Sequence, residues 1–220
     1  MRLIALFVFL GLFFACTPKS NEKNLNANKK TQTPTANQHK TQAKELSPED
    51  EDLPFLYFGE QDFKDFYTAF FVAFSQKDYD ALNSVIHPKY GLNIIETSGA
   101  MPQIVNVKDI SEYKLPTGQS LFEIDMRTIG FEMLEDELPI VKCDEPNYFD
   151  KLGAFTSDEN LLEHQQLIEH INPKNKEELL EIEKTIKKTV YNTANYIYYF
   201  SFIDGRWYLT FLDVRRPCEA

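Results

Sequence analysis

The chain has 220 residues, of which 43% are hydrophobic, 26% charged and 14% aromatic. This composition is typical of a globular protein and excludes a fibrous or fully disordered chain. The 34 acidic and 23 basic residues leave a formal net charge of −11. Because an acidic surface repels phosphate backbones, this charge argues against a nucleic-acid binder. The three cysteines are too few for a disulfide scaffold and lack the spacing of a metal site.

The start of the chain has the pattern of an export signal. An apolar run from Leu3 to Phe14 is too short to cross a bilayer as a helix but suits the core of a signal peptide. Ala15 and Cys16 follow it. This order resembles a bacterial lipoprotein signal, in which the cysteine thiol takes a diacylglycerol and cleavage leaves an acylated amine. The resemblance implies that residues 1–15 are a signal peptide and that Cys16 is the lipid attachment site.

Two details bear on this interpretation. Three residues before the cysteine, a phenylalanine stands where that family usually has leucine. The alternative is an ordinary secretory signal with an incidental cysteine. Thr17 is not the Asp that resembles an inner-membrane retention signal. We therefore expect a lipid-anchored protein of the cell envelope, placed in the outer membrane if the organism has two membranes.

Residues 16–52 are expected to form the lipidated N-terminus and a disordered tether. They are rich in Asn, Lys, Thr and Gln and contain no aromatic residue. Such a segment cannot bury enough apolar surface to offset the entropy lost on ordering. Residues 53–220 carry the aromatic and apolar residues and are expected to form a single α+β domain.

Hydrophobic periodicity predicts the elements of this domain. Aromatic residues from Phe63 to Phe74 recur at helical spacing and predict an amphipathic helix over 61–76. Near the end of the chain, Asp204-Gly205 is typical of a two-residue type I′ hairpin turn. The other predicted elements are a short helix over 78–87 that Pro88 ends, strands over 92–97, 120–128 and 137–143, helices over 158–171 and 173–189, and strands over 196–203 and 206–214.

Three of these features are similar to the nuclear transport factor 2-like superfamily, a cone-shaped α+β fold. They are the aromatic first helix, the short helix from Asp78 to Pro88 that runs into a strand, and the final hairpin around Asp204-Gly205. The resemblance implies N-terminal helices packed on a curved, mostly antiparallel sheet that ends in a long β-hairpin. The two inserted helices within 158–189 depart from the family pattern. No position matches the catalytic Asp and Tyr of the steroid-isomerase relatives, so no catalytic residue is carried over.

Histidines and carboxylates give no clear catalytic or metal constellation. His87 would need a carboxylate to orient it as a base, and the sequence identifies none. His164 and His170 lie six residues apart on a predicted helix, so they cannot share a metal as an i, i+4 pair does. Glu123 and Asp125 share one face of a predicted strand, which suits acid–base chemistry but is more typical of a solvated surface.

The acidic run between Glu132 and Glu145 lacks the spacing of a calcium loop. We therefore expect no catalytic residue, no metal site and no cofactor.

The aromatic surplus suggests a binding cleft. Tyr and Trp rings can line an apolar pocket while their polar edges find partners. We expect a cleft for an apolar or aromatic ligand between the first helix and the closing hairpin, with His87, Tyr90 and Trp207 at its mouth. The alternative is that the rings fill this space themselves and leave no pocket.

The sequence also predicts a disulfide. If Cys16 is lipidated, Cys143 and Cys218 are the remaining thiols of a chain exported to oxidising conditions, and we expect them to pair. The alternative is two unpaired cysteines, because the geometry is not visible in the sequence.

Taken as a whole, the sequence favours an envelope lipoprotein that displays a non-catalytic binding or assembly domain. The alternatives are a small-molecule enzyme of the cone-shaped fold and a protein–protein adaptor. The expected partners are the membrane, through the lipid anchor, and an apolar or aromatic ligand or an envelope protein.

Overall fold

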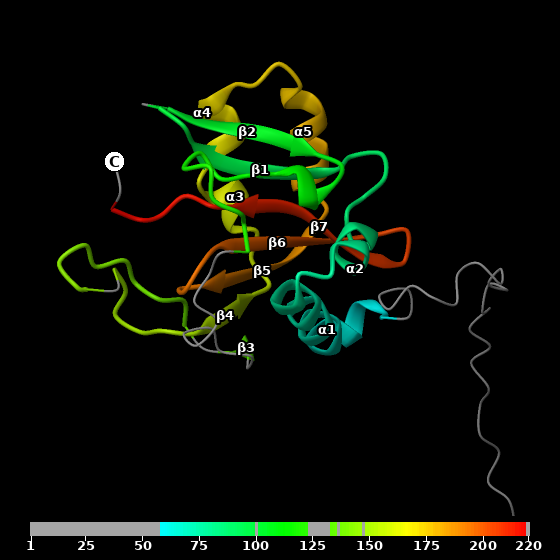
Figure 1. Ribbon diagram of the computed structural model, residues 1–220, viewed down its shortest axis with the longest axis horizontal. Coiled ribbons are helices and arrows are strands. Elements are labelled where there is room, and N and C mark those ends of the chain that lie inside the picture. The colour runs from blue at the N-terminus through cyan, green and yellow to red at the C-terminus, as the bar shows by residue number, and fades with distance from the viewer. Residues whose placement is uncertain (1–57, 100, 123–132, 136, 147, 219–220) are drawn as a thin grey trace, which may run out of the picture. The chain divides into compact units, whose positions relative to one another are not determined.

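The computed structural model describes residues 58–218, except residues 100, 123–132, 136 and 147 (Figure 1). The predicted signal peptide, Cys16 and the tether therefore lie outside the described residues. So do Glu123, Asp125 and most of the strand predicted over 120–128.

Seven strands form one mixed sheet in the order β2-β1-β7-β6-β5-β4-β3, which is open within the described residues. Neighbouring strands run antiparallel except for the parallel pairs β1–β7 and β3–β4. Together with the helices, this sheet confirms the α+β class. The strands are β1 Leu92–Thr97, β2 Pro102–Val107, β3 Met133–Leu134, β4 Ala154–Ser157, β5 Ile186–Asn192, β6 Ile197–Ile203 and β7 Arg206–Asp213.

Helices cover both faces of this sheet (Figure 1). The α-helices are α1 Phe63–Gln76, α2 Tyr79–Ser84, α3 Leu161–His164, α4 Leu167–Ile171 and α5 Lys176–Glu183, and the short 3-10 helices are η1 Glu60–Asp62 and η2 Ile110–Glu112. Successive residues of a strand point to opposite faces. Tyr198 and Phe200 of β6 therefore pack with α1 and α2, whereas Tyr199 packs with α3, α4 and α5. The chain thus has two hydrophobic clusters, one on each side of the sheet.

The aromatic face of α1 packs directly on β6 and β7. The ring centroid of Phe200 lies 5.4 Å from that of Phe63 and 5.3 Å from that of Phe70, and the Trp207 centroid lies 4.7 Å from that of Phe63. Aromatic pairs at such separations stabilise a core beyond the area they bury. The helix ends at Lys77, whose left-handed backbone returns its N–H to carbonyls of the last turn.

β6 and β7 pair antiparallel on either side of Asp204-Gly205. Both turn residues have positive φ, 51° and 80°, as a type I′ turn requires. The opposite end of this hairpin, where β6 begins and β7 ends, carries the pocket described below.

Several predicted elements differ in the structure. The helix predicted over 173–189 ends at Glu183, and residues 186–192 form β5 instead. Ile182, Ile186 and Val190 are spaced by four, as in one stripe of a helix, but a bulge between Ile186 and Lys188 places Ile186 and Val190 on opposite sides of the sheet. The β-branched residues around Thr189 favour a strand over a helix.

The helix predicted over 158–171 is broken into α3 and α4 at Gln166, which has a φ of 50°. Asn160 caps α3, because its side-chain oxygen accepts from the Glu163 N–H, and Thr156 before it pairs with Val190 in the sheet. The strand predicted over 137–143 is absent: in this described stretch only an isolated bridge links Val141 to Phe149. Pro139 lacks the N–H that a strand ladder needs. The second helix ends at Ser84 rather than at residue 87.

Candidate functional site

The cleft expected between α1 and the closing hairpin is filled by side chains. Trp207 is only 2% exposed, and its indole N–H donates to the Gly59 carbonyl at 2.9 Å. Its ring lies between Phe63 and Phe202, with centroids at 4.7 and 5.1 Å. These contacts fill the space around the indole, whereas Trp207 also borders a surface hollow with Glu60 and Lys188. A ligand cleft with His87, Tyr90 and Trp207 at its mouth stays a prediction.

The structure brings His87 and Tyr90 together, but away from Trp207. Their rings stack with centroids 4.5 Å apart, and Tyr208 lies edge-on to His87 at 4.7 Å. Trp207 and Tyr208 are neighbours in β7 and so face opposite sides of the sheet. His87 Nδ1 accepts hydrogen bonds from the backbone N–H groups of Lys89 and Tyr90. Burial lowers the pKa of His87, and the cations of Lys108 and Lys89 add to this effect. The imidazole is thus a neutral packing group.

A pocket of about 290 Å³ lies at the other end of the hairpin. Three segments distant in sequence form its walls: the loop before β4, the turn between β5 and β6, and the segment after β7. We call it the C-terminal pocket. Its rings are Tyr148, Phe149, Tyr191 and Tyr196, and the edge of the Phe149 ring meets the face of Tyr191 with a centroid separation of 5.7 Å.

Covalent and hydrogen bonds hold these walls together. Cys143 of the loop is joined to Cys218 of the last segment, with Cα atoms 5.6 Å apart. Thr193 of the turn donates its backbone N–H to the Gly153 carbonyl, and its hydroxyl accepts from the Gly153 N–H at 2.9 Å. The pocket is therefore built from segments that are fixed to one another.

Two asparagines place unpaired donors at this pocket. Asn192 is 3% exposed; its side-chain oxygen accepts from the Ala194 N–H, whereas its Nδ2 has no hydrogen-bond partner among the described residues. Asn195 repeats this pattern: the oxygen accepts from the Tyr196 N–H, and the buried Nδ2 has no partner within the described part of the chain. A buried unsatisfied donor costs about 1–3 kcal/mol. Each amide lies beside a buried phenol, Asn192 beside Tyr67 and Asn195 beside Tyr198, so both belong to a polar cluster in the core next to the pocket.

Two fully buried tyrosines lie next to these amides. Burial raises the pKa of Tyr67 and Tyr198, and the nearby amides of Asn192 and Asn195 oppose that rise only in part. Neither phenol oxygen has a partner in hydrogen-bonding geometry within the described residues. Both phenols stay neutral and belong to the core behind the pocket rather than to its lining.

The charged residues that line this pocket are two arginines. Arg215 donates two hydrogen bonds to Asp213, from Nε to Oδ1 at 2.8 Å and from Nη2 to Oδ2 at 2.6 Å. This pairing raises the pKa of Arg215. Burial raises the pKa of Tyr196 to about 12, and the cation of Arg216 acts against that rise. Two guanidinium groups thus lie at the pocket of a chain whose net charge is −11, and Asp213 neutralises that of Arg215.

One residue of the pocket is conformationally strained. Tyr148 has a φ of 62°, in the left-handed region that bulky residues avoid. Holding a non-glycine residue there costs about 1–2 kcal/mol. Such outliers cluster at ligand-binding sites, so the strain is an independent sign of function at this wall.

A buried carboxylate lies in a neighbouring hollow of about 420 Å³, which Arg215 and Arg216 also line. Glu96 is 6% exposed and accepts from Gln103 Nε2 and from the Tyr113 hydroxyl, one at each oxygen. Because both oxygens are already engaged, the arrangement favours a structural carboxylate over one that transfers protons.

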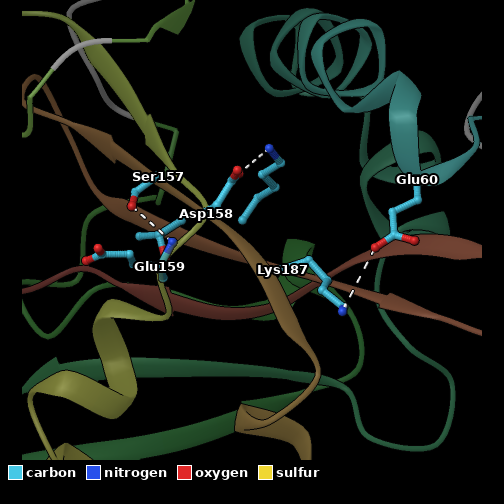
Figure 2. A network of polar contacts seen from close by, with 7 residues as sticks. Glu60, Ser157, Asp158, Glu159 and Lys187 are labelled. Atoms are coloured by element: carbon cyan, nitrogen blue, oxygen red, sulfur yellow. Dashed lines mark hydrogen bonds and ion pairs between the residues drawn. The ribbon is translucent and has the colours of Figure 1, made fainter.

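The charged surface at η1, β4 and β5 is a less suitable candidate for a functional site than the C-terminal pocket. Figure 2 shows Lys187 facing Glu60, with a nitrogen–oxygen distance of 4.0 Å, and Ser157 accepting from the Glu159 N–H. Lys188 pairs with Asp158, whose side chain is 81% exposed. Exposed ion pairs contribute about 0–1 kcal/mol. The described residues contain no group of three His, Cys, Asp or Glu that could hold a metal ion.

No family model, curated protein or solved structure matches this chain. In the described part of the chain, none of the helices has the length and apolar character needed to cross a bilayer. The pocket itself is therefore the basis for inferring a function. Its described lining residues offer rings, amides and guanidinium groups, and no carboxylate, imidazole or thiol.

Sequence reasoning missed most of this pocket. The strand predicted over 196–203 contains Tyr196, but no sequence signal marks Asn192, Asn195 or the two arginines as lining residues. The sequence feature that comes nearest to predicting the pocket is the expected Cys143–Cys218 disulfide, because it implies that the loop before β4 and the segment after β7 lie close together.

Proposed function

We propose that the chain is a lipid-anchored envelope protein whose folded domain binds a small molecule in the C-terminal pocket. The single observation that carries the binding proposal is the pocket of about 290 Å³, which three segments distant in sequence form and which aromatic rings line. Ligand sites typically combine apolar walls with a few polar groups that fix orientation. The described lining residues favour binding over catalysis, because they include no carboxylate, imidazole or thiol.

The envelope location is a separate part of this proposal. It is supported by the apolar run ending at Ala15-Cys16 and by the tether composition of residues 16–52. Two or more acyl chains would anchor the protein without help from a basic patch. A binding domain on such a tether would meet ligands of the envelope rather than of the cytoplasm.

The binding proposal is tested with phenylnaphthylamine, an uncharged aromatic probe whose fluorescence rises in apolar surroundings. The protein is the full chain carrying Cys16→Ala, so that no lipid competes for the probe. Leu152 lines the pocket at 55% exposure and Ile140 lies on the same loop at 63% exposure without lining it. We expect Leu152→Gln to weaken probe binding about fivefold, on the order of 1 kcal/mol, because apolar contact area is lost.

Ile140→Gln is the matched control and should leave the probe affinity unchanged. Equal affinities for the parent chain, Leu152→Gln and Ile140→Gln would mean that the probe does not occupy this pocket, and the binding proposal would be wrong.

A second candidate function is docking of another envelope protein. It is favoured by Ile140 and Val141, which are 63% and 42% exposed on the loop beside the pocket. Ile140→Gln separates the two functions, since it removes exposed apolar surface without altering the pocket.

A further inference from the structure

We propose that the loop between β3 and β4 docks a basic amphipathic segment of another protein: apolar side chains of the partner lie on Ile140, Val141 and Leu152, and its lysines or arginines face carboxylates of the loop. This inference rests on the docking function given above as the second candidate and adds the chemistry of the partner. It does not depend on whether the C-terminal pocket binds a small molecule.

Exposed apolar side chains gather on this loop. Among the described residues, seven large hydrophobic side chains are exposed, and four of the seven lie between residues 134 and 152. Single exposed apolar residues are common on protein surfaces, whereas a group of them indicates an interaction site. The four are Leu134, Ile140, Val141 and Leu152, at 37%, 63%, 42% and 55% exposure.

Contacts within the loop bring these side chains close together. The Asp150 N–H donates to the Ile140 carbonyl at 3.1 Å, and the Ile140 N–H donates to Asp150 Oδ1 at 2.8 Å. Ile140 therefore lies next to a residue that precedes Leu152 by two positions. A Cβ atom at Gly153 would lie 3.1 Å from Leu134 Cδ1, so the Leu134 side chain packs over the backbone that follows Leu152.

Main-chain bonds and the disulfide fix the shape of the loop. Val141 forms an antiparallel bridge with Phe149, and the Lys142 N–H donates to the Tyr148 carbonyl at 2.8 Å. The disulfide at Cys143 then joins the loop to the segment after β7, and Figure 1 shows the loop in yellow-green beside that segment. A preformed surface loses little conformational entropy when it binds, so most of its contact energy is available for affinity.

The charge of the loop determines which partner fits it. Asp144, Glu145 and Asp150 are exposed carboxylates within residues 140–150, beside the ammonium group of Lys142. Because like charges repel, such a loop on a chain with a net charge of −11 disfavours a second copy of the chain and an anionic membrane surface. A protein segment that carries lysines or arginines around apolar side chains complements both the carboxylates and the apolar residues.

The experiment uses a fluorescently labelled peptide of leucine and lysine that is amphipathic as a helix. It is titrated into the full chain carrying Cys16→Ala, and anisotropy reports binding. We expect Val141→Gln and Ile140→Gln each to weaken binding about fivefold, because apolar contact area is lost. Val72→Gln on α1 is the matched control, since Val72 is 39% exposed, and it should change the affinity less than about twofold.

The carboxylates are tested separately. Asp144→Asn with Glu145→Gln should weaken binding of the lysine peptide about threefold, because two favourable charge contacts are removed. Glu177→Gln with Glu178→Gln, an exposed pair on α5, makes the same change in net charge and should have a smaller effect. The corresponding peptide with glutamate in place of lysine should bind far more weakly than the lysine peptide.

The outcomes separate this inference from the docking function on which it rests. If Val141→Gln and Ile140→Gln weaken binding but the glutamate peptide binds as tightly as the lysine peptide, the loop docks a partner that is not basic and the inference is wrong. Equal affinities of the parent chain, Val141→Gln and Ile140→Gln, or no binding of either peptide, would refute docking at this loop. Near-ultraviolet circular dichroism verifies the fold of each variant, and Ile140→Gln decides the test if Val141→Gln loses the native signal.

Two further measurements address other occupants of the loop. Self-association of the parent chain in sedimentation experiments, abolished by Val141→Gln, would assign a second copy and overturn the inference. Binding to phosphatidylglycerol vesicles that Val141→Gln abolishes would assign a membrane surface, with the same consequence. Phenylnaphthylamine affinity, measured with Leu152→Gln as above, decides the pocket proposal independently of these results.

Discussion

Glu183 is a buried carboxylate at the end of α5, and its backbone carbonyl accepts from Asn160 Nδ2 at the start of α3. It is 5% exposed, and burial raises its pKa from 4.5 to about 7, with the charges of Glu163 and Glu169 adding to the rise. Lys184 opposes the rise. The folded state therefore holds a proton that the unfolded chain releases between about pH 4.5 and 7.

This proton makes stability depend on pH in a definite direction. The folded state binds more protons than the unfolded state in that window, so the contribution of Glu183 to stability is greatest at low pH and is lost as pH rises through 7. Glu183→Gln removes the ionisable group and keeps the shape. We expect it to raise the free energy of unfolding by about 2 kcal/mol near pH 8 and much less near pH 5.

Urea unfolding of the parent chain and of Glu183→Gln at both pH values measures this difference. Glu181→Gln, an exposed position on the same helix, is the control and should have little effect at either pH. A stabilisation by Glu183→Gln that is the same at both pH values would contradict the assignment.

At the scale of elements, the disulfide is the covalent bond that joins walls of the C-terminal pocket. Cys143 and Cys218 are 75 residues apart in sequence and join two of the three walls. We expect Cys143→Ser with Cys218→Ser to lower the free energy of unfolding by about 2–4 kcal/mol, because the unfolded chain gains entropy. We also expect it to weaken probe binding, because the segment that carries Arg216 is no longer held to the loop.

Titration of free thiols in the unreduced protein checks the bond itself, and reduction of the parent chain should reproduce the weaker probe binding of the double variant. Unchanged probe affinity in the double variant would show that the last segment stays in place without the disulfide.

The elements also show what sequence patterns can and cannot define. α1 was predicted almost to the residue, because its aromatic stripe fits only a helix and Lys77 ends it. The prediction of a helix over β5 is wrong, because the apolar residues of β5 are spaced by four as in a helix and a bulge, which the sequence does not reveal, sends Ile186 and Val190 to opposite sides of the sheet. The sequence does not predict the C-terminal pocket for a different reason: its walls come from residues near 149, 193 and 216, and nothing local in the sequence indicates that these segments meet.

At the scale of the whole molecule, the anchor and the domain make separate predictions. We expect mass spectrometry of the mature N-terminal peptide to show an acylated Cys16, because the signal resembles that of bacterial lipoproteins. Cys16→Ala should move the protein from the membrane fraction to the soluble fraction. Thr17→Ala is the neighbouring control and should stay membrane-bound. An unmodified thiol at Cys16, or a Cys16→Ala protein that stays firmly with the membrane, would refute the anchor but leave the pocket proposal intact.

The likeness to the nuclear transport factor 2-like superfamily remains a prediction. The described sheet is open and mixed, and helices bury both of its faces. Trp207 and the rings of α1 fill the space where the cone-shaped fold would leave a cavity. A binding function therefore depends on the C-terminal pocket and not on the interior implied by that likeness.

The most direct test of this account follows the side-chain amides of Asn192 and Asn195 by nuclear magnetic resonance while phenylnaphthylamine is added to the full chain carrying Cys16→Ala. Both residues line the C-terminal pocket. The account predicts that both amide signals shift, saturate together, and give the dissociation constant that fluorescence gives. The account would be contradicted if the probe binds while both amide signals stay unchanged, for example because it binds at His87 and Tyr90.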